Sequence, residues 1–157
     1  MADTIRELVI QSIIARAAVI LHVDSPPSGY ETNCGSNVFR ARSRIDPSEL
    51  PCVVIWPQAE GAENAHGQSR HRMPVKIEAI MAATAATASV NGEKLLGDLI
   101  TCFTSPLWAR TPDYIDSIVY QGGGYDAPEE GSQSVGVSAM FLVSYWSNIG
   151  DPYASDS

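Results

Sequence analysis

The chain has 157 residues and a formal net charge of −8, with 45% of its residues apolar and 18% charged. This length and composition predict one domain, spanning residues 1–157, that buries a core without disulfides or metal ions. The acidic balance argues against a protein that holds nucleic acid through its phosphates, and three widely spaced cysteines argue against a disulfide framework. The polar start and the lack of an apolar run of roughly 18 residues predict a soluble protein made in the cytoplasm.

The first predicted element is a mostly buried helix. Thr4 and Glu7 have the spacing of a capping box, in which each side chain satisfies a free backbone N–H of the first turn. Apolar residues recur at helical spacing from Ile5 to Ile20, and only a narrow side of the helix is polar. Residues 24–30 contain two consecutive prolines, which cannot continue the helical hydrogen bonds, so we expect the helix to end there.

Two strands are predicted next. Residues 38–45 alternate between apolar and basic side chains, which predicts a strand with one row of arginines: Arg40, Arg42 and Arg44. Residues 50–57 form a short continuous apolar run, as expected of an interior strand that is covered on both faces. Residues 58–71 are polar and predict a loop or a hairpin connection.

A third strand and a second helix follow. Residues 72–81 alternate again and predict a half-buried strand. Residues 82–89 are built from Ala, Thr and Ser, and they predict either a loop or the first turns of a helix that is secure only from about Asn91. The pair Ser105–Pro106 ends this helix, because the residue before a proline avoids the helical conformation.

The last strand, residues 134–147, has the strongest pattern in the chain. Its alternate positions are all apolar and predict a buried face: Val135, Val137, Ala139, Phe141, Val143 and Tyr145. On its other face we expect three large side chains to be covered by a helix of the same chain or by a second subunit: Met140, Leu142 and Trp146. Residues 115–120 predict a short strand that pairs with it as a hairpin, through the glycine-rich connection 121–133.

This order of elements favours the α+β class. Helices that do not alternate with every strand predict a single mixed or antiparallel sheet of four to five strands, with two main helices packed on one face. Residues 153–157 form a short C-terminal tail.

The sequence predicts no catalytic, cofactor or metal site. His66 and His71 lie in one polar segment, but they lack the spacing of a metal-binding motif. Cys34 has no histidine linked to it by a recognisable pattern, so an enzyme would require Cys34, His66 and His71 to meet in the fold. The glycines at 122–124 precede acidic residues instead of a basic helix start, which favours a hairpin tip over a phosphate-binding loop.

The arginine row has two interpretations. It can be the solvated face of a strand, or an edge strand that like charges protect from aggregation. Alternatively, it pairs with an acidic surface on a neighbouring copy of the chain, and the candidate acids are Glu60, Glu63, Glu129 and Glu130. Contacts between unlike patches generate a ring where the rotation closes.

Three features together resemble a known family. They are the buried first helix, the arginine-bearing strand that leads to the apolar run 50–57, and the closing strand that ends in Val143–Pro152. From Ile5 to Pro152, this arrangement resembles the tail terminator, or tail completion, proteins of long-tailed bacteriophages.

The resemblance implies a structural virion protein located at the neck end of the phage tail. Such a protein forms a ring, expected to be a hexamer, that caps the tail tube, ends its polymerisation and offers a surface to the head connector. DNA would pass through the lumen without specific binding, and the expected partners are further copies of the chain, the tail tube protein and the head–tail connector proteins.

Residue roles follow from the resemblance only as expectations. We expect subunit contacts at these positions: Arg40, Arg42, Arg44, Glu60, Glu63, Met140, Leu142 and Trp146. We expect contacts with the tube or connector at these positions: Arg70, Arg72, Tyr125, Glu129 and Glu130. Two alternatives remain: another head–tail joining protein of the neck, or a small α+β enzyme or ligand-binding domain.

Overall fold

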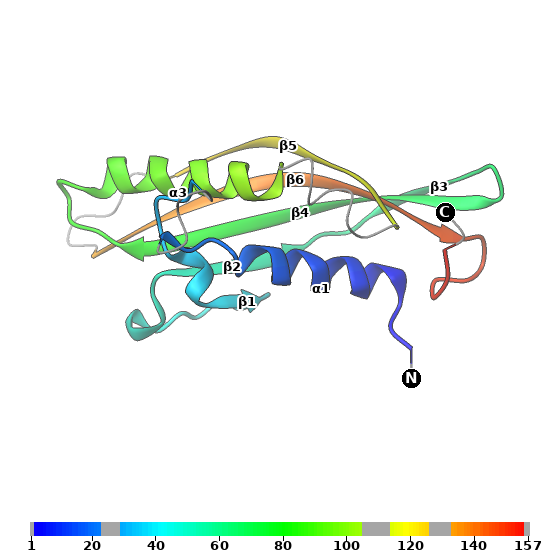
Figure 1. Ribbon diagram of the computed structural model, residues 1–157, viewed down its shortest axis with the longest axis horizontal. Coiled ribbons are helices and arrows are strands. Elements are labelled where there is room, and N and C mark those ends of the chain that lie inside the picture. The colour runs from blue at the N-terminus through cyan, green and yellow to red at the C-terminus, as the bar shows by residue number, and fades with distance from the viewer. Residues whose placement is uncertain (1, 23–28, 105–113, 126–132, 156–157) are drawn as a thin grey trace.

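The computed structural model describes residues 2–22, 29–104, 114–125 and 133–155, and it holds two α-helices and six strands (Figure 1). In chain order the elements are α1 (Ile5–Ala17), β1 (Val38–Arg40), β2 (Cys52–Pro57), β3 (Gly61–Ala65), β4 (Gln68–Ala82), α3 (Ala88–Phe103), β5 (Ile115–Tyr125) and β6 (Ser134–Asn148). Two short 3₁₀ turns, η2 (Cys34–Ser36) and η3 (Pro47–Glu49), flank β1.

The six described strands form one mixed sheet. Five of them follow the order β1–β2–β4–β6–β5, and β3 pairs with β4 outside this order. The β1–β2 pair is parallel, and every other pair is antiparallel. Strand β4 is long enough to pair with β3 through its first residues and with β2 through its later ones, while β6 follows its other edge. The predicted α+β fold, with one mixed sheet and two helices, is therefore confirmed.

The number of strands is larger than predicted, because part of the expected loop 58–71 is a hairpin. Strand β3 pairs with the start of β4, and only His66 and Gly67 separate the two strands. Both residues have positive φ, 54° and 81°, which is the conformation of a tight two-residue hairpin turn. A hairpin connection was one of the two interpretations of residues 58–71, but the sequence did not predict strand β3 or the position of the turn.

The predicted strand 38–45 is wrong after Arg40. Ala41 has a φ of 50°, in the left-handed region, and the chain leaves the sheet there. Asp46 then caps η3 by accepting a hydrogen bond from the backbone N–H of Ser48 at 2.9 Å. The three arginines consequently do not form one row on a strand face, since only Arg40 belongs to β1.

The core lies between the helices and one face of the sheet, which we call the inner face. Strand β6 runs from Ser134 to Asn148, within one residue of its prediction, and all six of its predicted core positions are buried. They join one apolar cluster with residues of both helices, including Ile13 of α1 and Leu99 of α3. Helix α1 contacts β1, β2 and β6, whereas α3 contacts β4, β5 and β6. The two helices thus divide the inner face between them.

The glycine-rich segment is part of β5 and not the tip of the hairpin. Gly123 pairs with Ala139 on the inner face, and a Cβ atom at Gly123 would lie 2.5 Å from the carbonyl oxygen of Ser138. Gly122 has a φ of 134° at a register shift between the two strands. Glycine is therefore required here for close backbone approach, and β5 is longer than the predicted strand 115–120.

Candidate functional site

The sheet face opposite the helices, which we call the outer face, is the main candidate surface. Cross-strand register places Met140 opposite Lys76, Leu142 opposite Pro74, and Trp146 opposite Arg70. Directly paired residues share a face, so these side chains form one surface with Val119 of β5, which pairs with Leu142. The three β6 side chains are half-buried and Val119 is 51% exposed. No described helix covers them.

Charges on the outer face are paired within the chain. Arg70 contacts Asp116 at 2.9 Å, Lys76 contacts Glu78 at 3.2 Å, and Arg72 contacts Glu63 at 3.2 Å. These three bases and three acids cancel, so the net charge of −8 is carried by the rest of the chain. Electrostatic repulsion of another acidic protein is consequently small at the outer face.

Aromatic rings on this face lie beside cations. The Arg70 guanidinium lies 5.8 Å from the centre of the Trp146 ring, and the Lys76 ammonium lies 5.8 Å from that of Trp56. Two buried donors, Trp56 Nε1 and Arg70 Nε, have no acceptor among the described residues. Sequence analysis assigned Trp146 and Arg70 to different partners, but the structure places them in one patch.

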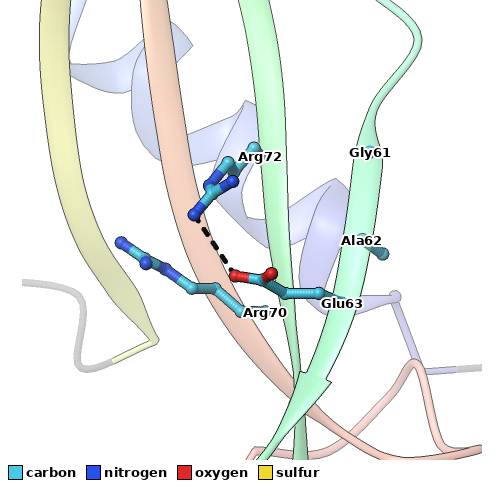
Figure 2. A pocket seen from close by; sticks show the side chains of 5 residues that line it. All are labelled: Gly61, Ala62, Glu63, Arg70 and Arg72. Atoms are coloured by element: carbon cyan, nitrogen blue, oxygen red, sulfur yellow. Dashed lines mark hydrogen bonds and ion pairs between the residues drawn. The ribbon is translucent and has the colours of Figure 1, made fainter.

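The β3–β4 hairpin adds a shallow hollow to this face. Its lining residues are Gly61, Ala62, Glu63, Arg70 and Arg72, and Figure 2 shows the Glu63 carboxylate turned toward Arg72. Half of the Arg72 side chain is exposed. The hollow thus presents two guanidinium groups, each paired with an acid of the same chain: Arg70 with Asp116 and Arg72 with Glu63.

The arginines expected to contact a neighbouring subunit differ in their surroundings. Arg40 donates to Glu7 at 2.6 Å, and this hydrogen bond lowers the pKa of Glu7 and raises that of Arg40. Arg42 donates to both carboxylate oxygens of Glu49, at 2.6 and 2.8 Å. Arg44 is exposed and forms no hydrogen bond or ion pair with the described part of the chain. Of these three arginines, Arg44 alone has no charged partner in the described part of the chain.

Glu60 lies in a polar junction that sequence analysis missed. Its carboxylate accepts hydrogen bonds from Arg6 and from the Tyr145 hydroxyl, and His71 Nδ1 lies within hydrogen-bond distance of it. His71 Nε2 lies 2.7 Å from the Ser147 hydroxyl, and the His71 ring stacks on Tyr145 with a centroid separation of 4.5 Å. Because an ionised carboxylate only accepts, His71 Nδ1 donates to it and Nε2 accepts from Ser147 in the neutral ring.

Electrostatics at the junction follow from burial and hydrogen bonding. Burial raises the pKa of Glu60, but the donors Tyr145, Arg6 and His71 outweigh burial, so the pKa of this carboxyl lies below its usual value. Burial together with the hydrogen bond to Glu60 raises the pKa of Tyr145. The junction is therefore held by an ionised Glu60 and a neutral Tyr145.

The order Ser147–His71–Glu60 matches the order of groups in a serine hydrolase triad. However, Ser147 is only 3% exposed, and the same carboxylate is also bound by Arg6 and Tyr145. A nucleophile must reach its substrate, so this geometry does not support catalysis. We interpret the junction as structural: it joins α1, the segment before β3, β4 and β6.

The residues that an enzyme would have needed do not come together. Cys34 is fully buried beside α1, where burial raises the pKa of its thiol to about 12, and His66 lies in the hairpin turn. His71 belongs to the polar junction. Within the described residues, no group of three or more His, Cys, Asp or Glu side chains is placed to hold a metal ion.

Among the described helices, neither has the length and apolar character that crossing a membrane requires.

The expected tube or connector contacts lie at separate places. Arg70 and Arg72 belong to the outer face, whereas the Tyr125 ring packs on Gly92 of α3 and its hydroxyl lies 2.6 Å from that of Ser89. Glu129 and Glu130 lie outside the described residues.

Sequence comparison adds nothing to these assignments, since no protein-family model and no curated protein matches the chain.

Proposed function

We propose that this chain is a structural virion protein of a bacteriophage tail, and specifically a ring-forming tail terminator. The proposal starts from the resemblance in its sequence, from the first helix to the closing strand. The observation that carries it is the outer face, which presents Met140, Leu142, Trp146 and Val119 without cover from either described helix. A sheet that exposes large apolar side chains on one side is typical of a protein that works by contact with another protein.

In this role the outer face meets a protein partner in the particle. Because Arg70 and Trp146 share one patch, we assign the whole face to a single partner, the end of the tail tube. Its balanced charges let the acidic chain approach an acidic partner without strong repulsion, and its apolar side chains supply the contact area. The sheet edges remain for neighbouring copies in the ring. An acidic ring also lets DNA pass without holding its phosphates.

A capping experiment tests this proposal. Purified chain is added to polymerising tail tube protein, and electron microscopy records tube lengths and any ring at the tube end. We expect shorter, capped tubes. Tubes of unchanged length without rings would contradict the proposal, and rings that bind only purified head connector would indicate another neck protein.

A pair of matched variants links capping to the outer face. Val119→Asp places a charge on the exposed part of this face, whereas Val19→Asp places the same charge on another exposed valine, which is 40% exposed after α1. Val119→Asp should abolish capping and Val19→Asp should preserve it, with unchanged thermal unfolding in both variants. Equal capping by the two variants would show that the outer face does not carry the contact.

A further inference from the structure

Two separate surface segments carry charges of opposite sign that have no partner among the described residues. Arg44 lies four residues after the end of β1, which is one edge strand, and its guanidinium has no partner among the described residues. Helix α3 packs on the inner face of the sheet, against β6, β5 and β4. In Figure 1, β1 and α3 lie on opposite sides of β4.

The exposed side of α3 forms a groove with residues 29–31. We call it the α3 groove, and its charged or apolar lining residues are Glu31, Val90, Glu93, Lys94 and Asp98. The carboxylates of Glu31 and Glu93 are exposed and form no ion pair with the described residues, and Lys94 is the one base beside them. Val90 is 58% exposed, more than any other large apolar side chain in the described ranges.

The floor of the groove is firmly built. Asp98 is 3% exposed and accepts hydrogen bonds from the backbone N–H groups of Glu31 and Thr32, at 3.0 and 2.8 Å, and from the Thr32 hydroxyl at 2.6 Å. These bonds attach the segment at Glu31 to α3. Glu31 and Glu93 therefore line one groove, and neither carboxylate has an ion-pair partner among the described residues.

We propose that the α3 groove binds the segment 41–45 of a second copy of this chain. Arg44 of one copy lies between Glu31 and Glu93 of the next, and its aliphatic stem packs on Val90. The contact joins two different patches, so each copy offers one of each, and repetition gives a ring where the rotation closes. This inference rests on the proposed function, because it assigns the subunit contact of the ring.

Charge complementarity favours a second copy as the occupant. The groove has more unpaired acidic than basic side chains among the described residues. Segment 41–45 offers the unpaired Arg44, whereas the neighbouring Arg40 and Arg42 are already bound to acids of the same chain. Arg44 forms no ion pair with Glu31 or Glu93 within the described residues, so both patches are open to another copy. Glu60 and Glu63, the acids first expected to meet these arginines, are engaged by Arg6 and Arg72.

A cross-linking experiment between two variants, each with one added cysteine, tests the contact and leaves its charges intact. One chain carries Ser43→Cys beside Arg44, and the other carries Gly97→Cys in the groove, where an added Cβ atom meets nothing within 4 Å. The three native cysteines are buried and do not interfere. With a short bis-maleimide, we expect several-fold more product from the mixture than from either chain alone.

Charge reversal then identifies the ion pair. Glu93→Lys in the groove chain should remove the mixed product, and Arg44→Glu in the other chain should restore it. Glu63→Lys, a reversal on the distant hairpin, should change nothing. Equal product in the unmixed samples, no mixed product at any concentration, or a lack of response to Glu93→Lys would each overturn the contact.

The result also separates this inference from the proposed function. Chains that cap tail tubes but ignore both charge reversals would overturn the contact and leave the tail terminator assignment in place. Chains that cross-link as expected but never cap a tube would support the contact and contradict the assignment.

Discussion

The two faces of the sheet are built on the same strands but differ in what covers them. On the inner face, Phe141 is 1% exposed and lies against Phe103 of α3 and Tyr120 of β5. On the outer face, its neighbour Leu142 is half-buried beside Pro74 and Val119, with no described helix above it. The comparison shows that the inner face stabilises the single chain, whereas the outer face has contact area that the single chain does not use.

The largest expected effect comes from removing one large side chain on each face. Phe141→Ala should lower the free energy of unfolding by about 3–5 kcal/mol, because it leaves a cavity in a packed core. Leu142→Ala should cost well under half as much, since less of its surface is buried. Urea unfolding measures both variants, and equal losses would show that the outer face is already covered in the isolated chain.

The second effect concerns the polar junction at the end of the inner face. Glu60→Gln should lower the free energy of unfolding by about 1–3 kcal/mol at neutral pH, because it removes the charge that three donors share. The pKa of Glu60 is lowered in the folded state, so its contribution is present above the usual value of 4.5 and is lost as the pH falls through the folded value. The difference between the variant and the natural chain should therefore shrink in acid.

A matched control for the junction lies on the outer face. Glu63→Gln breaks an ion pair in which both side chains are about half exposed, so it should cost about 0–1 kcal/mol. Unfolding curves from neutral to acidic pH compare the two variants. If Glu63→Gln proves as costly as Glu60→Gln, the interpretation of the junction as the specific support of α1 fails.

The last comparison uses two adjacent glycines of β5. Gly123 pairs with Ala139 on the inner face and has no room for a Cβ atom, whereas Gly124 pairs with Ser138 on the outer face and has open space. Gly123→Ala should destabilise the chain by about 1–3 kcal/mol through overpacking. Gly124→Ala should be nearly neutral, and thermal unfolding of both variants gives the comparison. Similar melting temperatures would contradict the close approach of β5 to β6.

Local pattern predicted the elements whose structure depends on periodic burial. Strands β6 and β2 and helix α3 were predicted with small errors at their ends, because an apolar period of two or of three to four residues reflects one buried side. Helix α1 was also predicted, but it ends at Ala17, well before the expected end at residues 24–30. The early end of β1 and the tight turn at residues 66–67 were not predicted, although a hairpin connection was one of the two interpretations of residues 58–71. Both depend on positive φ at a single residue that is not glycine, at Ala41 and at His66, and composition does not reveal such a conformation.

The candidate surfaces show the same division. Sequence alone determined that residues 134–147 form a two-sided strand, that the chain is acidic, and that large side chains occupy the second face of that strand. Only the tertiary structure decided that Arg70 meets Trp146, that Glu60 is held by Arg6, His71 and Tyr145, and that Arg44 remains free. The physical reason is that the alternation of buried and exposed positions along a strand or helix is set by residues close together in the sequence. Its partners across the sheet follow from strand order and register, which the whole chain sets together.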